Sequence, residues 1–182
     1  HSFGLFGARG LGLCEELGLL DRVDFVVGTF SKSLGGVGGF CVSRHPELDL
    51  IRMASRPYIF TASPPPAVIA ATRCALDRVL EGADLRARLW RHVHHLYAEL
   101  LRLGYRVGSA DPGPVAALVF EQREVAMAHW QGLLDAGVYT NLMIPPATPI
   151  GTNIVRISLS AAHSDQDIAH IVGALESLAK HP

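Results

Sequence analysis

The chain has 182 residues, 49% of them apolar, and a formal net charge of −1 at pH 7. This size is enough for one large domain or two small ones with a packed core. The near-neutral charge offers no basic surface for a phosphate backbone, which argues against nucleic-acid binding, and no apolar run reaches the roughly 18 to 20 residues of a membrane span.

The cysteines and the first residues indicate where the protein works. Cys14, Cys41 and Cys74 are odd in number, lack C-x-x-C spacing and lie among apolar neighbours, which is typical of reduced thiols in a core. We therefore expect core cysteines and a cytoplasmic location. Because the chain begins at His1 without an initiator methionine or a signal peptide, we also expect it to be a piece of a longer protein.

The first half of the chain predicts alternating short strands and helices. Residues 24–28 form an unalternating apolar run, which is typical of a buried strand in a parallel sheet. A second strand is predicted at 40–43, and a helix with proline at its first position is predicted to begin at 45–47. The prolines at 64–66 precede an alanine-rich helix that should end near Gly82.

The middle of the chain predicts a long amphipathic helix at about residues 84–103, with Gly104 as its stop. Its apolar face carries leucine or valine at positions 85, 89, 93, 96, 100 and 103. We interpret this helix as a linker between two parts of the chain.

The second half predicts a compact mixture of strands and helices. Strands are expected at 115–120, 138–143 and 154–160, with a helix at about 124–136. A last helix opens at 164–167, where Ser-Asp-Gln-Asp resembles a capping box.

These elements predict an α/β fold class with two domains. We expect residues 1–83 to be the C-terminal part of a large domain built on a parallel sheet. Residues 84–182 should form the linker helix and a small C-terminal α+β domain.

Residues 28–40, G-T-F-S-K-S-L-G-G-V-G-G-F, are the strongest functional signal. Thr29 and Ser31 place hydroxyl groups at the carboxyl end of a predicted strand, where open α/β sheets bind ligands. Neither G-K-[ST] nor G-x-G-x-x-G occurs here, which disfavours a nucleotide-binding module. Lys32 beside these hydroxyls suits pyridoxal phosphate, whose aldehyde takes an amine, although a solvated lysine in a turn is the simpler alternative.

The segment 28–33, with the glycines after it, resembles the cofactor-lysine motif of the α-oxoamine synthases. These are pyridoxal-phosphate enzymes of fold type I that condense an amino acid with an acyl-CoA. The resemblance continues in His-Ser-x-Gly-x-x-Gly at 1–7, in Arg-Ile-Ser at 156–158 and in Ala-Ala-His at 161–163. It implies a fold of the type I pyridoxal-phosphate transferases, of which the chain is the C-terminal portion.

Two further segments are most similar to the bacterial serine palmitoyltransferases of that family: Arg-Pro-Tyr-Ile-Phe-Thr-Ala-Ser at 56–63 and Pro-Pro-Ala-Thr-Pro at 145–149. The resemblance implies that L-serine and a long-chain acyl-CoA, such as palmitoyl-CoA, are condensed with decarboxylation to 3-ketodihydrosphingosine. It also implies a homodimer with shared active sites. Any membrane contact should be peripheral, because no long basic amphipathic helix is present.

Two alternatives remain open. One is a synthase of the same family that uses glycine or alanine, of the 2-amino-3-ketobutyrate CoA ligase or 8-amino-7-oxononanoate synthase type. The other is a non-catalytic partner subunit with the same fold, against which the presence of Lys32 argues.

The resemblance assigns cofactor roles to matching positions. Lys32 binds the aldehyde and removes the α-proton of the substrate, which a buried, electropositive surrounding would favour. His1 binds the phenolic oxygen, while Thr29 and Ser31 bind the phosphate. Residues 61–62, Thr61 and Ala62, reach the phosphate of the neighbouring subunit, although Thr61 could instead cap the turn into the proline-led helix.

Substrate roles fall on the second half. Arg156 pairs with the substrate carboxylate, unless it is an ordinary solvent-facing charge, and Thr148 of the Ala-Thr-Pro loop is assigned to the substrate as well. Some family members carry an arginine where this chain has Ile144, so a charge-assisted contact of about 1.5 to 3 kcal/mol is absent. The histidines at 92, 94 and 95 lie on one predicted helix without complementary ligands, so we expect a solvated or interfacial face and no metal site.

Overall fold

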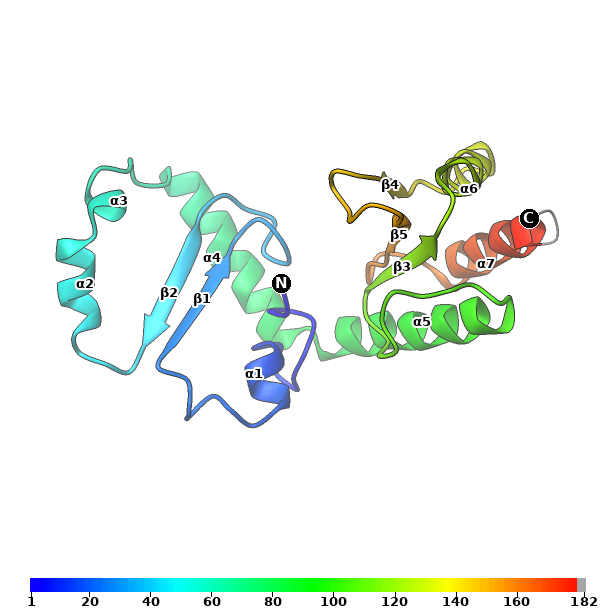
Figure 1. The fold of residues 1–182 in the computed structure, drawn as a ribbon. Helices are drawn as coiled ribbons and strands as arrows, with labels where there is room; N and C mark the ends of the chain where they lie inside the picture. Colours follow the sequence, from blue (N-terminus) through cyan, green and yellow to red (C-terminus); the bar gives the residue numbers. More distant parts are fainter. Residues whose placement is uncertain (180–182) are drawn as a thin grey trace. The chain divides into compact units, whose positions relative to one another are not determined.

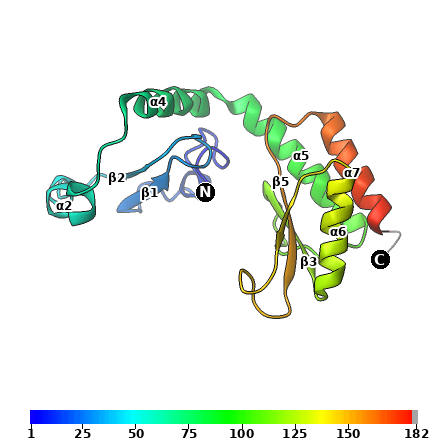
Figure 2. The ribbon, with the colours of Figure 1, turned by 90° about the horizontal axis from the view of Figure 1, so that it is seen from above.

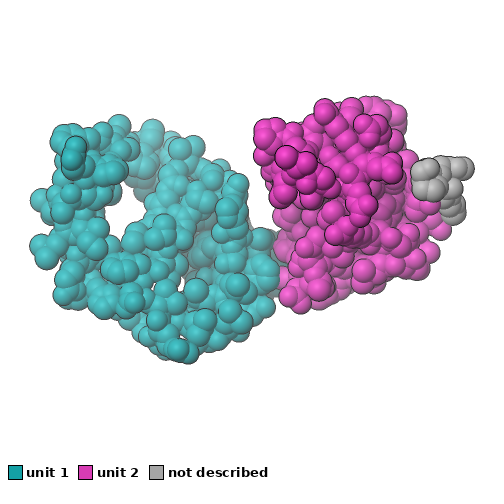
Figure 3. Space-filling view, viewed as in Figure 1, with its two compact units in different colours: residues 1–86 teal, residues 87–182 magenta. Residues whose placement is uncertain are grey.

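The computed structural model describes residues 1–179, which divide into two compact units. Unit 1 comprises residues 1–86 and unit 2 comprises residues 87–182 (Figure 3). Helix α5 (Ala83–Arg102) begins in unit 1 and continues in unit 2. No helix of the described residues is long and apolar enough to cross a membrane. The domain boundary expected at residues 83 and 84 stays a prediction about the whole protein.

Unit 1 is built around an antiparallel pair of strands, with helix α4 running along one side of it (Figures 1 and 2). The strands pair in a register that sets Val27 opposite Cys41 and Gly28 opposite Phe40. Its elements are α1 (Leu13–Glu16), β1 (Phe25–Thr29), β2 (Gly39–Ser43), α2 (Leu48–Ala54), α3 (Arg56–Ile59) and α4 (Pro66–Glu81). The two predicted strands and the proline-led helix are confirmed, while the helix after Pro46 begins later than predicted.

The expectation that β1 is a buried strand of a parallel sheet is wrong for the described residues. Its one ladder is antiparallel, and the side chain of Val27 is 77% exposed. Leu34 is the one large apolar side chain of unit 1 that is buried among the described residues. A strand is buried only when elements cover both of its faces, and unit 1 by itself does not supply them.

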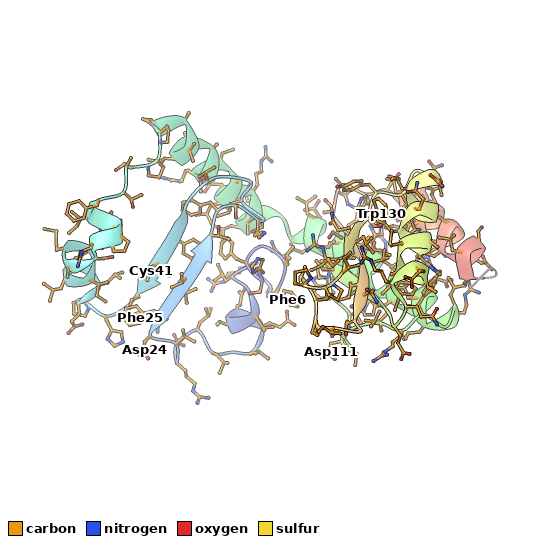
Figure 4. All side chains as sticks on the ribbon, turned by 45° about the horizontal axis from the view of Figure 1, so that its top comes forward. Phe6, Asp24, Phe25, Cys41, Asp111 and Trp130 are labelled. Carbon is orange, nitrogen blue, oxygen red and sulfur yellow. The ribbon has the colours of Figure 1, made fainter. Side chains whose placement is uncertain are left out.

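The prediction of core cysteines is wrong for the same reason. Cys41, which lies on β2 next to the β1 strand that begins at Phe25 (Figure 4), is exposed. Cys74 is exposed and Cys14 is half-buried. All three belong to unit 1, which encloses almost no apolar volume.

Unit 2 contains a three-stranded antiparallel sheet with a packed core (Figure 2). Its elements after α5 are β3 (Val115–Phe120), α6 (Arg123–Asp135), β4 (Asn141–Met143), β5 (Asn153–Ser158) and α7 (Asp165–Ala179). The strand order is β3-β5-β4, and β5 alternates buried residues such as Val155 and Ile157 with residues that are half-buried or exposed. This alternation is typical of a sheet that packs one of its faces against a core.

Helix α5 supplies the predicted apolar face to this core. Leu89, Val93, Leu96 and Leu100 are buried, whereas Leu85 is 40% exposed. The helix ends at Arg102, and the predicted stop at Gly104 follows two residues later with a φ of 80°.

Another glycine explains why β4 is shorter than predicted. Gly137 has a φ of 79° and its N–H donates to Leu134 O over 2.9 Å, while the N–H of Val138 donates to Leu133 O over 2.8 Å. This is the Schellman pattern that ends a helix. Because the N–H of Val138 is bonded to a carbonyl of α6, it cannot join a strand ladder, and β4 begins only at Asn141. Trp130 of α6 (Figure 4) then donates its indole N–H to Thr140 O over 3.2 Å.

The capping box predicted at the start of α7 is confirmed. The N–H of Asp167 donates to Ser164 Oγ over 3.2 Å, and the N–H of Ser164 donates to Asp167 Oδ2 over 2.7 Å. The latter bond, with one from the hydroxyl of Ser164, holds the pKa of the Asp167 carboxyl below its usual value. Two backbone donors at the helix start are thereby satisfied.

Of the two environments expected for the histidine face, His92 has the interfacial one, between α5 and α7. Its side chain is 3% exposed, and its Nε2 atom lies 2.8 Å from Asp165 Oδ1. Arg91 Nη2 donates to the same oxygen over 3.2 Å, so one carboxylate at the first turn of α7 holds two residues of α5. The hydrogen bonds from His92 and Arg91 lower the pKa of the Asp165 carboxyl. The described residues contain no group of three or more potential metal ligands.

Replacing Asp165 tests this connection. A carboxyl whose pKa is lower in the folded protein stabilises the fold above its unfolded pKa, and this contribution is lost as the pH falls through the folded pKa. We expect Asp165→Asn to lower the melting temperature by about 1 to 4 °C at pH 7, and the difference from wild type to narrow below about pH 4. Asp135→Asn, at an exposed position of α6, is the control. A difference that is independent of pH would contradict the assignment.

Candidate functional site

The loop that carries Lys32 is closed by hydrogen bonds at both of its ends. The N–H of Phe30 donates to Gly38 O over 2.9 Å, and the N–H of Gly36 donates to Phe30 O over 2.7 Å. Directly after the lysine, the N–H of Gly35 donates to Lys32 O over 2.9 Å, with Gly35 at a φ of 61°. A turn that needs a positive φ explains why glycine follows so closely on the lysine.

The strands that lead into this loop approach each other too closely for side chains at two positions. A Cβ atom on Gly39 would lie 2.7 Å from Gly28 O. A Cβ atom on Gly28 would collide with the ring of Phe40, which packs against the rings of Phe3 and Phe30 at centroid distances of 5.6 and 6.0 Å. These glycines therefore set the position from which the loop starts.

Two hydroxyl groups lie together where β1 ends. Thr29 Oγ1 and Ser31 Oγ are 2.9 Å apart, and the N–H of Ser31 donates to Thr29 Oγ1 over 3.2 Å. The two hydroxyls and the N–H groups of the loop form a set of neutral donors of the kind that binds phosphate oxygens.

A pocket of about 260 Å³ lies next to these hydroxyls in unit 1. His1, Thr29, Lys32 and Ser33 are among its lining residues, and none of the lining residues is acidic. An amine, hydroxyl donors and the absence of a competing carboxylate fit a small ligand that carries a phosphate and an aldehyde. Three of the predicted site residues are thus brought together, with Ser31 adjacent. Lys32 is exposed within the described chain, so the expected buried surrounding is not supplied by unit 1.

Thr61 and Ala62 do not line this pocket. Both residues are exposed, and the hydroxyl of Thr61 donates to Pro57 O at the end of α3. The simpler alternative for Thr61 was a cap of the turn into the proline-led helix, but this contact is made to α3, and α4 has no side-chain cap. A role toward another subunit stays a prediction.

Arg156 lies in unit 2, on β5. Its Nη2 atom donates to Asn141 Oδ1 over 2.9 Å, and its Nε atom is buried without a partner among the described residues. Arg156 and Asn141 line a pocket of about 460 Å³, together with His163 and Asp167. Arg156 is therefore not an ordinary solvent-facing charge.

Thr148, the other predicted substrate residue, has a structural contact. Its side chain is buried and its hydroxyl donates to Thr152 O over 2.6 Å, which ties the two ends of the loop before β5 together. It does not line the pocket that holds Arg156. His163 lies at the turn after β5, where its Nδ1 atom accepts the N–H of Ser160 over 3.1 Å.

Sequence reasoning missed Asn141 and Ser33 as site residues. Asn141 is paired with Arg156 in the register of β4 and β5, and this register is not readable from the sequence. The available signal was a lone amide between the apolar residues of a predicted strand. Ser33 is adjacent to the lysine and lines the pocket, but the family motif assigns the phosphate-binding hydroxyl to Ser31.

Comparison with known proteins gives a consistent result. The model of the family "Aminotransferase class I and II" matches residues 3–175. The serine palmitoyltransferase of Caulobacter vibrioides is 51% identical over 168 residues, which cover 92% of this chain and 41% of that protein.

Solved structures show the same likeness. The structure of Sphingomonas wittichii serine palmitoyltransferase has a TM-score of 0.94 at 45% identity and covers 99% of this chain and 45% of that one. A structure described as SPT with PLP internal aldimine has a TM-score of 0.95 at 42% identity and covers 99% of this chain and 46% of that one. The chain therefore spans less than half the length of these three relatives.

Adding a methyl group at Gly39 tests the close approach of the two strands. We expect Gly39→Ala to lower the free energy of unfolding by about 1 to 3 kcal/mol, because the strands must separate or distort. Gly113→Ala is the matched control, since a Cβ atom there meets nothing within 4 Å, and it should change stability by less than about 0.5 kcal/mol. Equal effects of the two substitutions in urea denaturation would contradict the role given to Gly39.

Proposed function

Because the chain belongs to the class I and II aminotransferase family, which confirms the predicted fold class, we propose that it is part of a pyridoxal-phosphate-dependent acyltransferase. The enzyme condenses L-serine with a long-chain acyl-CoA and releases CO2, CoA and 3-ketodihydrosphingosine. The observation that carries this proposal is the placement of Lys32 and Thr29 in one pocket without an acidic residue. The 51% identity to a serine palmitoyltransferase supports the choice of substrates.

The residues around the lysine loop hold the cofactor. Lys32 Nζ binds the aldehyde, Thr29 and Ser31 donate hydrogen bonds to the phosphate, and His1 binds the phenolic oxygen. When bound, pyridoxal phosphate supplies a conjugated ring that withdraws electrons from the bonds of the substrate α-carbon. The 2.9 Å contact between the hydroxyls of Thr29 and Ser31 keeps both oxygens at one place, and a phosphate that accepts from both would replace this contact and the bond from Thr29 Oγ1 to Gly38 O.

Lys32 also moves the proton. In the holoenzyme its Nζ atom would accept the α-proton of serine, and for this transfer the amine must be neutral. Neutral lysine requires a desolvated or electropositive surrounding. Lys32 is exposed in unit 1. The relatives are longer than this chain, and we propose that a segment equivalent to their additional length covers Lys32 in the full-length protein. The exposed apolar side chains of Phe25, Val27 and Val42 on β1 and β2 suit the same covering.

Arg156 binds the substrate carboxylate. Its guanidinium presents a buried Nε–H without a partner, which suits an oxygen of a carboxylate. Thr61 and Ala62 complete the phosphate site of a neighbouring subunit, so the enzyme acts as a homodimer with shared sites. It works in the cytoplasm and meets a membrane only at its surface.

The runner-up is a glycine- or alanine-using synthase of the same family. Ile144 favours it in one respect, because it removes a cation that some serine-using members carry next to the Pro145–Pro149 loop. The Ala-Thr-Pro sequence of that loop argues for serine. A non-catalytic partner subunit is the third reading, and the retained Lys32 argues against it.

The first test is product formation by the full-length protein. We expect L-serine and palmitoyl-CoA to give the 3-keto product by mass spectrometry, with CoA released in equal amount. Lys32→Ala and Lys32→Arg should lower kcat by about 10²- to 10⁴-fold or more, because both remove the proton-accepting amine. Lys180→Arg, at the other lysine of the chain, is the control. Turnover of glycine or alanine in place of serine would contradict the substrate assignment.

The second test introduces the missing cation. We expect Ile144→Arg to lower the KM for L-serine by about 10- to 100-fold, because a charge-assisted contact to the carboxylate is gained. Ile144→Gln adds polarity without charge and should leave the KM within about threefold of wild type. If Ile144→Arg binds serine no more tightly than Ile144→Gln, another group already fills this role.

A further inference from the structure

The strand register of unit 2 sets one amide beside Arg156. β5 pairs with β3 on one side, where Arg156 is opposite Ala117, and with β4 on the other, where it is opposite Asn141. Directly paired residues in neighbouring strands point to the same face of a sheet. Alanine has no polar atom in its side chain, so Asn141 is the cross-strand neighbour able to hold the guanidinium.

The contact is a single hydrogen bond to a neutral acceptor. Arg156 Nη2 donates to Asn141 Oδ1 over 2.9 Å, and both side chains are half-buried. An amide oxygen fixes the direction of the guanidinium without neutralising its charge. A carboxylate at this position would also fix the direction of the guanidinium, but it would neutralise the positive charge that is needed to bind the substrate carboxylate.

Arg156 otherwise lacks an anionic partner among the described residues. None of the ion pairs there includes it, and its Nε atom is buried without a hydrogen bond. Asp167, which lines the same pocket, already accepts from the N–H and hydroxyl of Ser164. A buried N–H without a partner is costly, and an incoming carboxylate oxygen removes that cost.

We propose that Asn141 is a positioning residue, which holds Arg156 in the orientation that binds the carboxylate of the amino-acid substrate. The inference rests on the proposed function, because it needs a carboxylate substrate. Asn141 itself acts through Arg156. Replacing Asn141 should therefore weaken the binding of the amino-acid substrate, and only in a protein that retains the guanidinium of Arg156.

The first experiment is a titration of full-length holoenzyme with L-serine, followed by the visible absorbance of the bound cofactor. Asn141→Ala should raise the dissociation constant for serine by about 5- to 30-fold, because the guanidinium is no longer held in place. The KM for palmitoyl-CoA should stay within about twofold of wild type, since that substrate is not bound through Arg156. Unchanged serine affinity in Asn141→Ala would overturn the proposal.

A double-mutant cycle separates positioning from a general loss of structure. Lysine in place of Arg156 keeps the charge and loses the planar fork that Asn141 orients. In the Arg156→Lys background, Asn141→Ala should change serine affinity by less than about twofold. A full additive effect in that background would show that Asn141 acts independently of Arg156 and would overturn the proposal.

Two further variants guard against a folding defect. Asn141→Asp keeps an acceptor for Nη2 and adds a negative charge, so it should fold like wild type and bind serine at least as weakly as Asn141→Ala. Asn153→Ala removes an amide from the opposite face of β5, which donates to Phe120 O and Glu121 O over 3.3 and 3.1 Å. It should lower the melting temperature and leave serine affinity within about twofold of wild type. Wild-type serine affinity in Asn141→Asp would count against the proposal.

The outcomes also distinguish this inference from the proposed function. If wild-type holoenzyme shows no absorbance change with L-serine, the proposed serine chemistry fails. If wild type responds and Asn141→Ala responds equally, the role of Asn141 alone is refuted.

Discussion

The close approach of β1 and β2 at Gly28 and Gly39 is the constraint on which the candidate site depends. A side chain on Gly39 would meet the backbone oxygen of Gly28, so the pair can form only without one. From this fixed start the backbone turns through Phe30 and Gly38 and places two hydroxyls and one amine within a few residues of each other. The two hydroxyls bond to each other, neither they nor the amine has a carboxylate of the described residues beside it, and the pocket next to them is suited to an anionic ligand.

The two units differ in how they are stabilised. Unit 2 has a core of its own, in which β3, β5, α5, α6 and α7 bury leucine, isoleucine and valine side chains. Unit 1 buries Leu34 and leaves side chains such as Val27 and Phe60 exposed, at 77% and 83%. A domain that is stable by itself rarely exposes so many large apolar side chains. It agrees with a chain that spans less than half the length of its relatives, and it explains why the predicted burial of β1 and of the cysteines fails.

Local signals in the sequence predicted much of the fold. The glycine after α5, the capping box of Ser164 and Asp167, and the prolines before α4 act within a few residues of where they stand, so their consequences could be foreseen. The lysine loop was found in the same way. The contacts of His92 with Asp165 and of Arg156 with Asn141 join residues 73 and 15 positions apart, and these depend on packing and strand register. Sequence patterns place such residues on elements but do not pair them.

The proposed function requires the amine of Lys32 to bind covalently to the aldehyde of pyridoxal phosphate. The most direct measurement is reduction of the full-length protein with borohydride after incubation with the cofactor, followed by peptide mapping with mass spectrometry. The chain has two lysines, Lys32 and Lys180, which fall in different peptides. We expect the added mass of the reduced cofactor on the peptide that contains Lys32. A peptide of Lys32 without that mass, from protein that has bound the cofactor, would contradict it.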